Sequence, residues 1–422
     1  MKGERMRRKV RVGAGILLAV LLSATAIGVT TGQAGAATVR GFNGKTITIG
    51  GMWDTANFAG AQVGTEGYIN QINKTNYLHG IKLKFAGYVN DDSDPATALS
   101  GVRQLINQYQ VFAIVPDLSA VNPGSYLASQ KILYVGGGFD YSYCSTKVTT
   151  SGWGYSAGGC LVPQNPPVVS NVYGQFYTYV KAKTGSVHPT MGIFSNGNAS
   201  GSNSAKTATV AAKGVGFNVV YNKASIPSTA SDYTPYVQQL MTSNNGKPPQ
   251  AIACQLTAQC IPMWTALKNA GYTGSYWSPL GPIPSLYSTM AGTVTIATYN
   301  NAPNPGLTGM QNAMDAVTPG TQLASYSNVP SYLDTAMFAT AVRLVQAKKQ
   351  AITPANVRAV LSTIKWGIPG LVGPITYPAS TVAGTPYCTE FLTYTGGAAQ
   401  QVYPYSCSYR LFKVTPAAEK AS

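Results

Sequence analysis

Short apolar segments alternate with segments of helical periodicity along most of this chain. Residues 46–51 have the pattern of a strand, a helical stretch follows and ends near residue 76, and residues 81–85 alternate as a second strand. The same order recurs between residues 190 and 270. Strands that alternate with helices form mainly parallel sheets covered by helices. The sequence therefore predicts an α/β fold with two similar halves.

The other expected elements continue the same alternation. In the first half they are a helix at 98–109 and strands at 111–115 and 132–135. In the second half they are strands at 190–194, 217–221 and 251–254 and helices at 204–213, 233–241 and 262–270. A third alternation has a strand at 294–299, helices at 332–348 and 355–364, and a turn-rich β segment at 367–413. Residues 163–167, Pro-Gln-Asn-Pro-Pro, cannot sustain regular structure and mark a crossing between the halves.

The first 36 residues differ from the rest in composition. A basic start is followed by an apolar run at residues 12–29 and by Ala34-Gly35-Ala36, which has the small residues that a signal peptidase cleaves. We expect residues 1–36 to be a cleaved signal peptide and the protein to be secreted, either extracellular or held in the cell envelope. An uncleaved membrane anchor is the alternative, because the apolar run approaches the ~18 residues of a span. Arg7-Arg8 leaves both the general and the twin-arginine export routes open, and the lack of a nearby cysteine excludes a lipid anchor.

Charge and length narrow the classes of protein that remain. Without residues 1–36 the chain keeps 23 basic and 12 acidic residues, a net charge of +11. These bases are scattered singly, which argues against a nucleic-acid partner. The 386 residues that follow the signal are too many for one compact core, so two domains are expected.

Six cysteines follow the predicted signal and form three pairs that are close in sequence. An even number of cysteines in an exported chain favours disulfides, and local pairing is the simplest of the 15 possible connectivities. The expected pairs are Cys144 with Cys160, Cys254 with Cys260, and Cys388 with Cys407. A zinc site is disfavoured because His79 and His188 lie far from these cysteines in sequence. We expect no metal or other cofactor.

One motif raises the possibility of an enzyme. Residues 154–158, Gly-Tyr-Ser-Ala-Gly, fit the hydrolase pattern G-x-S-x-G, which needs a strand before the serine and a helix after it. The flanking residues suit neither element, and the one available base, His188, precedes Pro189. With two histidines and few acids, most catalytic schemes lack the residues they need. A binding protein is the better prediction, and a secreted hydrolase is the less favoured alternative.

Three aspartates crowd into four positions at Asp91, Asp92 and Asp94. Asp94 followed by Pro95 is typical of a helix N-cap and its first helical residue. Asp91 and Asp92 precede the helix, where its positive end favours carboxylates. A calcium loop would require alternating oxygen ligands that close on a glutamate, and Pro95 and an apolar helix stand there instead. The sequence therefore predicts a helix start.

Several segments resemble the leucine/isoleucine/valine-binding receptors of the type I periplasmic binding proteins, which serve ATP-driven importers. The resemblance covers nearly all of residues 45–375 and is carried by the segments Asn90-Asp-Asp-Ser-Asp-Pro-Ala-Thr-Ala, Gly64-Thr-Glu-Gly-Tyr-Ile-Asn-Gln-Ile-Asn, Ile132-Leu-Tyr-Val-Gly-Gly-Gly and Ile352-Thr-Pro-Ala-Asn-Val-Arg-Ala-Val-Leu. It implies two α/β lobes, each with a mostly parallel sheet flanked by helices, joined by three crossovers. A ligand is then captured as the lobes close.

The resemblance also implies a division of the chain and a set of partners. Residues 37–165 and 300–365 form the first lobe, residues 166–299 and 366–415 form the second, and residues 416–422 are a flexible tail. The partners are a small-molecule ligand and the permease of an ABC importer, and the protein is expected to be a monomer and not an enzyme. A ligand-sensing receptor subunit without transport is the alternative function.

The expected ligand-binding residues lie at the carboxyl ends of strands, where ligands bind in open α/β sheets. In the first lobe they are Trp53, Asp54, Phe58, Leu118, Ser119, Ala120, Gly138, Phe139 and Asp140. In the second lobe they are Asn198, Gln255, Thr257 and Leu280. Trp53 and Phe58 are expected either to stack on the ligand or to pack within their lobe.

Leu280 occupies the position where the family has a glutamate that binds the ligand's ammonium. Burying an ammonium without a carboxylate is costly, so a plain branched-chain amino acid is disfavoured. Asp140 is expected either to replace that glutamate from the other lobe, or to be a loop cap or a solvated charge. The predicted ligand is a small polar or aromatic-containing solute, such as an amino-acid-like compound or an amide.

Overall fold

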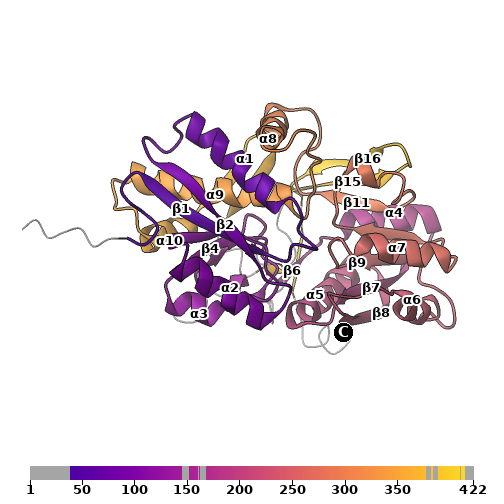
Figure 1. Cartoon of the computed structure of the whole chain (residues 1–422). Coiled ribbons are helices and arrows are strands. Elements are labelled where there is room, and N and C mark those ends of the chain that lie inside the picture. The colour runs from indigo at the N-terminus through magenta and orange to yellow at the C-terminus, as the bar shows by residue number, and fades with distance from the viewer. Residues whose placement is uncertain are drawn as a thin grey trace, which may run out of the picture. The chain divides into compact units, whose positions relative to one another are not determined.

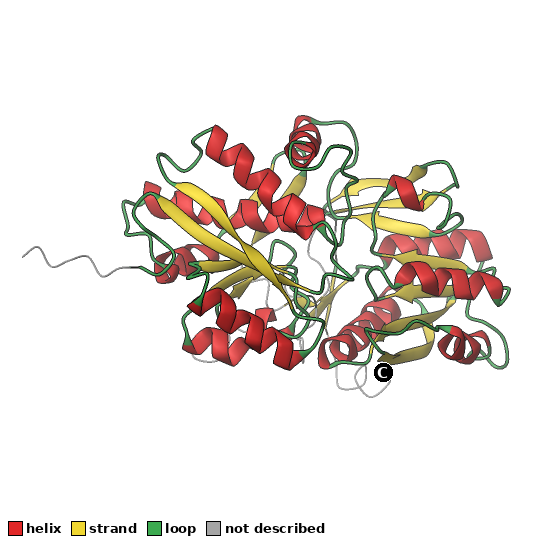
Figure 2. Cartoon of the chain, viewed as in Figure 1, coloured by secondary structure: helices red, strands yellow, loops and turns green. Residues whose placement is uncertain are grey.

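The computed structural model describes one parallel and one mainly parallel sheet, and the helices that cover them (Figures 1 and 2). The described residues are 39–144, 152–159, 161, 168–376, 382–383, 388–408 and 410–413. The predicted signal peptide at 1–36, the proline-rich crossing at 163–167, Cys160 and the tail at 416–422 lie outside them. Among the described residues, no helix is long and apolar enough to cross a membrane.

The first sheet has five strands in the order β2-β1-β3-β4-β5, and all neighbours are parallel. Its strands are β1 (Thr46–Trp53), β2 (Lys82–Asn90), β3 (Ala113–Asp117), β4 (Leu133–Gly136) and β5 (Gly154–Tyr155). The helices between them are α1 (Ala61–Lys74), α2 (Pro95–Asn107) and α3 (Gly124–Ser129). Every residue of β3 and β4 is buried, which is typical of strands covered by helices on both faces.

The second sheet has seven strands in the order β16-β15-β11-β10-β9-β7-β8. Its strands are β7 (Thr190–Asn196), β8 (Asn218–Ile226), β9 (Ala251–Cys254), β10 (Ser275–Ser278), β11 (Val294–Ala297), β15 (Thr389–Tyr394) and β16 (Ala399–Ser406). The helices of this half are α4 (Gly174–Thr184), α5 (Ala199–Val215), α6 (Thr234–Met241) and α7 (Cys260–Asn269). The strands from β7 to β11 are parallel, and β15 and β16 add an antiparallel edge.

After β11 the chain returns to the core of the first sheet. It forms α8 (Pro305–Asp315), α9 (Asn328–Ala347) and α10 (Pro354–Leu361), and α9 packs against α1, α10, β3 and β4. The hairpin of β12 (Lys365–Ile368) and β13 (Val372–Thr376) contributes Trp366, Leu371 and Ile375 to the same core. The first core is therefore built from two segments that are far apart in sequence.

Smaller elements complete the described structure. A three-stranded sheet has β6 (Val168–Ser170) between β14 (Val382–Ala383) and β17 (Leu411–Lys413). Two short 3-10 helices are η1 (Tyr141–Cys144) and η2 (Pro284–Leu286). The short elements α3 and β5 were not among the expected ones, because six and two residues are too few to show a periodicity.

Two of the three expected disulfides are present. Cys254 is bonded to Cys260, and Cys388 is bonded to Cys407. The second bond closes the β15–β16 hairpin directly beside its end pair, Thr389 and Ser406. Because Cys160 lies outside the described residues, the pairing of Cys144 with Cys160 stays a prediction.

The predicted helix start at Asp94 is confirmed. Its Oδ1 accepts a hydrogen bond from the backbone N–H of Thr97 at 2.8 Å, and Pro95 is the first residue of α2. Asp91 precedes α2, as expected, and is buried there. Its side chain is only 1% exposed, and burial raises its pKa.

Candidate functional site

A cavity of about 250 Å³ lies where loops from both sheets meet. The first sheet contributes Asn57 after β1, Ala120 after β3 and Phe139 after β4. The second sheet contributes the segments that follow β7, β9 and β10, and the first half of α9 closes the lining with Asp334. The carboxyl ends of parallel strands therefore surround the cavity, as in other α/β ligand sites.

Six of the residues expected to bind the ligand line this cavity. They are Phe58, Ala120, Phe139, Asn198, Gln255 and Thr257. The rings of Phe58 and Phe139 stack with their centroids 5.5 Å apart. Asn198 is also the N-cap of α5, because its Oδ1 accepts a hydrogen bond from the N–H of Gly201 at 2.7 Å.

The other seven expected residues do not line the cavity: Trp53, Asp54, Leu118, Ser119, Gly138, Asp140 and Leu280. Trp53 stacks on Tyr88 at 4.2 Å, and Leu118 packs with Trp53 and Phe58 in a small apolar cluster. Leu280 is fully buried in the core of the second sheet. These side chains support the walls of the cavity from behind.

Asp54 is hydrogen-bonded to two residues that line the cavity. Its Oδ2 accepts hydrogen bonds from Asn57 Nδ2 and from Ser93 Oγ, both at 2.8 Å, and both of those residues line the cavity. Ser119 has a comparable supporting role, because its Oγ accepts a hydrogen bond from the N–H of Val121 at 3.1 Å and so holds the loop after β3. Both residues shape the lining without forming part of it.

Asp140 combines a loop-capping role with a contact to the second sheet's half. Its Oδ1 accepts a hydrogen bond from the N–H of Ser142 at 2.8 Å, and its Oδ2 lies 3.4 Å from Ser200 Oγ. Burial raises the pKa of Asp140 to about 6, against the lowering effect of its bonds to Ser142 and Ser200. The preceding Gly138 has φ +72°, and a side chain there would meet the carbonyl oxygen of Gly159.

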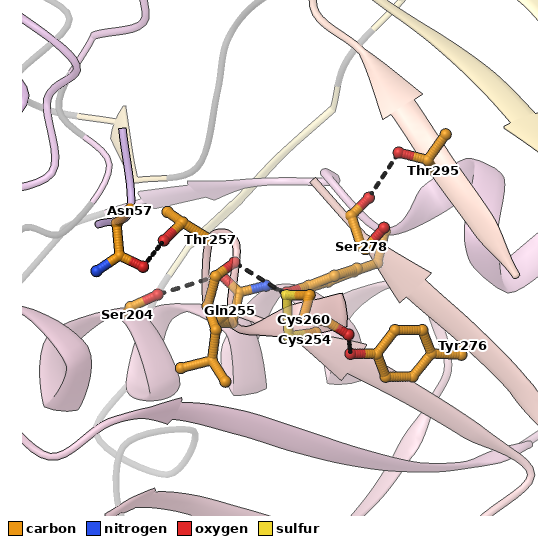
Figure 3. Close-up of a disulfide and its surroundings, with 11 residues drawn as sticks. Asn57, Ser204, Cys254, Gln255, Thr257, Cys260, Tyr276, Ser278 and Thr295 are labelled. Atoms are coloured by element: carbon orange, nitrogen blue, oxygen red, sulfur yellow. Dashed lines mark hydrogen bonds between the residues drawn. A yellow bond between two sulfur atoms is a disulfide. The ribbon is translucent and has the colours of Figure 1, made fainter. Parts of the chain in front are cut away.

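Two further hydrogen bonds join the loops of the two sheets beside the cavity. Thr257 Oγ1 donates to Asn57 Oδ1 at 2.9 Å (Figure 3), and Ser200 Oγ donates to the carbonyl oxygen of Ala120 at 2.8 Å. All four residues line the cavity. The loops of the two sheets are therefore linked by hydroxyl hydrogen bonds beside the cavity.

The disulfide between Cys254 and Cys260 brackets the segment of the second half that faces the cavity (Figure 3). Gln255, Leu256 and Thr257 stand between the two cysteines, and all three line the cavity. Both the oxygen and the nitrogen of the Gln255 side-chain amide are hydrogen-bonded. Its Oε1 accepts a hydrogen bond from Ser204 Oγ at 3.2 Å, and its Nε2 donates to the hydroxyl of Tyr173.

Several lining residues were missed by the sequence analysis. Asn196, Trp277, Ser325 and Asp334 line the cavity, and each has a buried polar atom without a hydrogen-bond partner among the described residues. A sequence feature could have identified Asp334 as a candidate site residue: it is a carboxylate on the apolar face of the predicted helix at 332–348. That helix has the sequence Ser-Tyr-Leu-Asp-Thr-Ala-Met-Phe around it, where a charged residue interrupts the buried stripe.

The cavity has a sparse set of ionisable groups. Among its described lining residues there is no lysine, arginine or histidine, and Asp334 is the one carboxyl group. Burial raises the pKa of Asp334 from 3.8 to about 8, opposed by a hydrogen bond that its Oδ1 accepts from the N–H of Ala157 at 3.1 Å. The lining otherwise combines hydroxyls and amides with the rings of Phe58, Phe139, Tyr173, Trp277 and Tyr326.

The motif at 154–158 does not form a hydrolase elbow. Ser156 follows the two-residue strand β5 and leads into a turn, and no helix begins there. His188 is exposed, and its Nδ1 lies 3.2 Å from the carbonyl oxygen of Gly216. Within the described part of the chain, no group of three or more histidine, cysteine or acidic residues is arranged to hold a metal ion.

Comparisons with known proteins give one family and many similar folds. Residues 46–387 match the model of a family described as periplasmic binding protein. A search of curated proteins finds no match.

Among solved structures, a branched chain amino acid ABC transporter from Thermus thermophilus with bound valine is 14% identical, with a TM-score of 0.66 over 86% of this chain and 97% of that one. A fatty acid ABC transporter substrate-binding protein from Thermomonospora curvata is 15% identical, with a TM-score of 0.68 over 88% and 94%. A solute binding protein from R. palustris in complex with benzoate is 13% identical, with a TM-score of 0.64 over 86% and 98%. The predicted α/β fold class is confirmed by these similarities.

Proposed function

Because the chain belongs to the periplasmic binding protein family, we propose that it captures a small solute in the cavity described above and delivers it to the permease of an ABC importer. The observation that carries the proposal is the cavity itself, which is lined by loops at the carboxyl ends of strands from both sheets. Its volume is many times the roughly 10–15 Å³ that one buried water needs. Aromatic rings and hydrogen-bonding groups line it together, as in other small-molecule sites.

We infer that the two sheets belong to two lobes that close on the solute. The first lobe then comprises residues 37–165 and 300–365, and the second comprises residues 166–299 and 366–415. Because the hairpin β12–β13 packs into the first core, we extend the first lobe to residue 376. The hydrogen bonds from Thr257 to Asn57 and from Ser200 to Ala120 would break on opening, so they favour the closed population.

The ligand that suits this lining is a small polar or aromatic-containing solute. Phe58 and Phe139 offer stacked rings, while Asn198, Gln255 and Thr257 offer amide and hydroxyl groups. Proteins of similar fold are described with bound valine and benzoate and as carriers of fatty acids. We infer an exported, monomeric protein whose signal peptide is residues 1–36.

A thermal-shift screen of the mature protein tests the capture of a solute. The panel contains amino acids, amides, amines, aromatic acids and sugars, and a ligand at 100 times its Kd stabilises the native state by ~2.7 kcal/mol. The expected result is a raised unfolding midpoint with one chemical class and no chemical change in the ligand. Turnover of the bound compound would overturn the proposal, and so would the absence of a shift with every class.

A pair of variants then locates the binding site. Phe58→Ala should weaken binding of the compound found in the screen, because Phe58 lines the cavity. The control is Tyr88→Ala, which removes a ring that is 40% exposed and stacks on Trp53 behind the cavity. Equal affinities of both variants and the parent would show that the compound binds elsewhere.

A further inference from the structure

The cavity contains a carboxyl group that the protein satisfies only in part. Asp334 on α9 is 1% exposed and lines the cavity. Its Oδ1 accepts a hydrogen bond from the N–H of Ala157 at 3.1 Å, whereas its Oδ2 has no partner in the described part of the chain. An unpaired buried carboxyl oxygen is costly, which indicates that a bound molecule completes the site.

No ionisable side chain of the neighbouring described elements forms a hydrogen bond or an ion pair with Asp334 Oδ2. The helices and strands that pack against α9 carry Glu66, Tyr68, Lys74, Asp117, Tyr134 and Arg358. Arg358 donates its Nε–H to the carbonyl oxygen of Gly152 at 2.6 Å and lies over the ring of Trp153. Burial, together with nearby charges that include Asp334, raises the pKa of Tyr143, and its hydroxyl donates to the carbonyl oxygen of Asp117 at 2.8 Å. The described protein therefore supplies no cation to this carboxyl group.

We propose that Asp334 selects solutes that carry a cationic amine, and that the ammonium group donates a hydrogen bond to Asp334 Oδ2. The proposal rests on the solute-binding function and names its substrate class. An ammonium ion enters a cavity of this kind only if a carboxylate accompanies it, and Asp334 is the one carboxyl group among the described lining residues. No lysine or arginine is present in that lining to neutralise an acidic ligand instead.

The rest of the lining defines the remainder of the solute. Tyr173, Trp277, Ala208 and Ala211 line the part of the cavity contributed by the second half of the molecule. These side chains are apolar or aromatic and are buried in the core of that half. Trp277 Nε1 has no acceptor among the described residues, so it can donate one hydrogen bond to the solute. The expected solute is an amine with an aromatic or aliphatic body.

Binding of such a solute releases a proton. At neutral pH the free protein holds the Asp334 carboxyl group mainly protonated, because burial raises its pKa to about 8. The amine arrives as an ammonium ion, and the ion pair forms when the proton of Asp334 passes to the buffer. Charge balances, since one cation enters the site and one proton leaves it.

Matched pairs of probes test this assignment on the mature protein at pH 7. Phenethylamine is compared with phenylacetate, and hexylamine with hexanoate, so that each pair shares a carbon skeleton. The amines should raise the unfolding midpoint and the carboxylates should not. In Asp334→Asn, affinity for the amine should fall by about 30-fold or more, as expected when one partner of a buried charge pair is removed.

Calorimetry gives a readout that a purely structural role of Asp334 would not change. Amine binding is measured at pH 7 in phosphate and in MOPS, whose ionisation enthalpies differ and neither of which is a primary amine. The difference between the binding enthalpies in the two buffers should correspond to nearly one proton released per amine bound at pH 7. It should decrease as the pH rises through 8, and it should be absent in Asp334→Asn. The matched control is Asp117→Asn, because Asp117 is also buried with an unpaired oxygen but does not line the cavity.

The outcomes of these experiments distinguish amine selection by Asp334 from solute binding in general. Stabilisation by the carboxylates alone would refute selection of amines and leave solute binding intact. Amine binding that is unchanged in Asp334→Asn, or the absence of amine binding, would also refute it. If Asp334→Asn does not fold, discrimination within the probe pairs and proton release by the parent protein decide the question.

Discussion

At the scale of single residues, the three aspartates before α2 occupy different environments. Asp94 is exposed and caps the helix, and hydrogen bonds from Thr97 lower its pKa. Asp92 is exposed with φ 49°, and its Oδ1 accepts a hydrogen bond from Asn90 Nδ2 at 2.6 Å. Asp91 is buried. Its Oδ1 accepts a hydrogen bond from the N–H of Ser93 at 2.9 Å. Identical side chains close together in sequence therefore differ in burial: one caps the helix, and the other two hydrogen-bond within the turn before it.

Asp94→Ala should lower the thermal unfolding midpoint by about 1–3 °C, because the N–H of Thr97 loses its acceptor. Asp94→Asn keeps an acceptor and should stay close to the parent protein. Ligand affinity should be the same in all three proteins, since Asp94 does not line the cavity. The midpoints come from calorimetry, and a large loss of affinity in Asp94→Ala would contradict the capping role.

At the scale of elements, the turn between β9 and α7 brings a disulfide and the cavity together. The residues between Cys254 and Cys260 are anchored from both halves of the molecule, to Ser204 and Tyr173 by Gln255 and to Asn57 by Thr257 (Figure 3). We infer that this short cross-linked turn holds the lining side chains of Gln255 and Thr257 in position. Such preorganisation reduces the entropy that binding would otherwise cost.

Replacing both Cys254 and Cys260 by alanine should weaken ligand binding severalfold and reduce stability by roughly 2 kcal/mol, the chain-entropy value for so short a loop. The control replaces Cys388 and Cys407, which close a longer loop on the β15–β16 hairpin. That variant should lose roughly 3 kcal/mol and keep its affinity, because none of the residues from 388 to 407 lines the cavity. Denaturant titration and calorimetry measure the two effects. Equal affinity in both variants would show that the cross-link does not organise the site.

At the scale of the whole molecule, several buried carboxyl groups influence stability in the same direction. Burial raises the pKa of Asp91, of Asp117, of Asp140 to about 6, and of Asp334 to about 8. In the unfolded chain these groups ionise near pH ~3.9. The stability that they contribute is therefore fully present below pH ~4 and is lost as the pH rises through each folded-state pKa.

The free energy of unfolding should accordingly fall between pH 5 and pH 8, by at most ~1.4 kcal/mol per pH unit for each group that titrates there. Asp94 and Asp232 have lowered pKa values, so they titrate below this window. Denaturant titrations at pH 5, 6.5 and 8 measure the trend, and Asp334→Asn should flatten it between pH 6.5 and 8. Charge repulsion in this cationic chain predicts the opposite sign, so a rise in stability with pH would contradict the role of the buried carboxyls.

Much of the order of strands and helices was predictable because it depends on local hydrophobic periodicity, although the 11-residue helices α4 and α8 were not expected. The strand at 46–51 and the helix at 332–348 were both found from the pattern alone, and they correspond to β1 and α9. Cysteine spacing predicted the two described disulfides, and the Asp94-Pro95 pair predicted the start of α2. Each of these features is set by residues that are close together in sequence.

The lining of the cavity depends on contacts between distant segments. Asp140 was the expected carboxylate because it follows a strand, yet its side chain turns to Ser142 and Ser200 and does not line the cavity. Asp334 lines it because α9, about 200 residues further along the chain, packs against the first sheet. The sequence by itself determined the elements, since their periodicity is local. Only the tertiary structure decided which polar groups face the cavity, because that choice depends on how helices pack across sequence distances that no local pattern encodes.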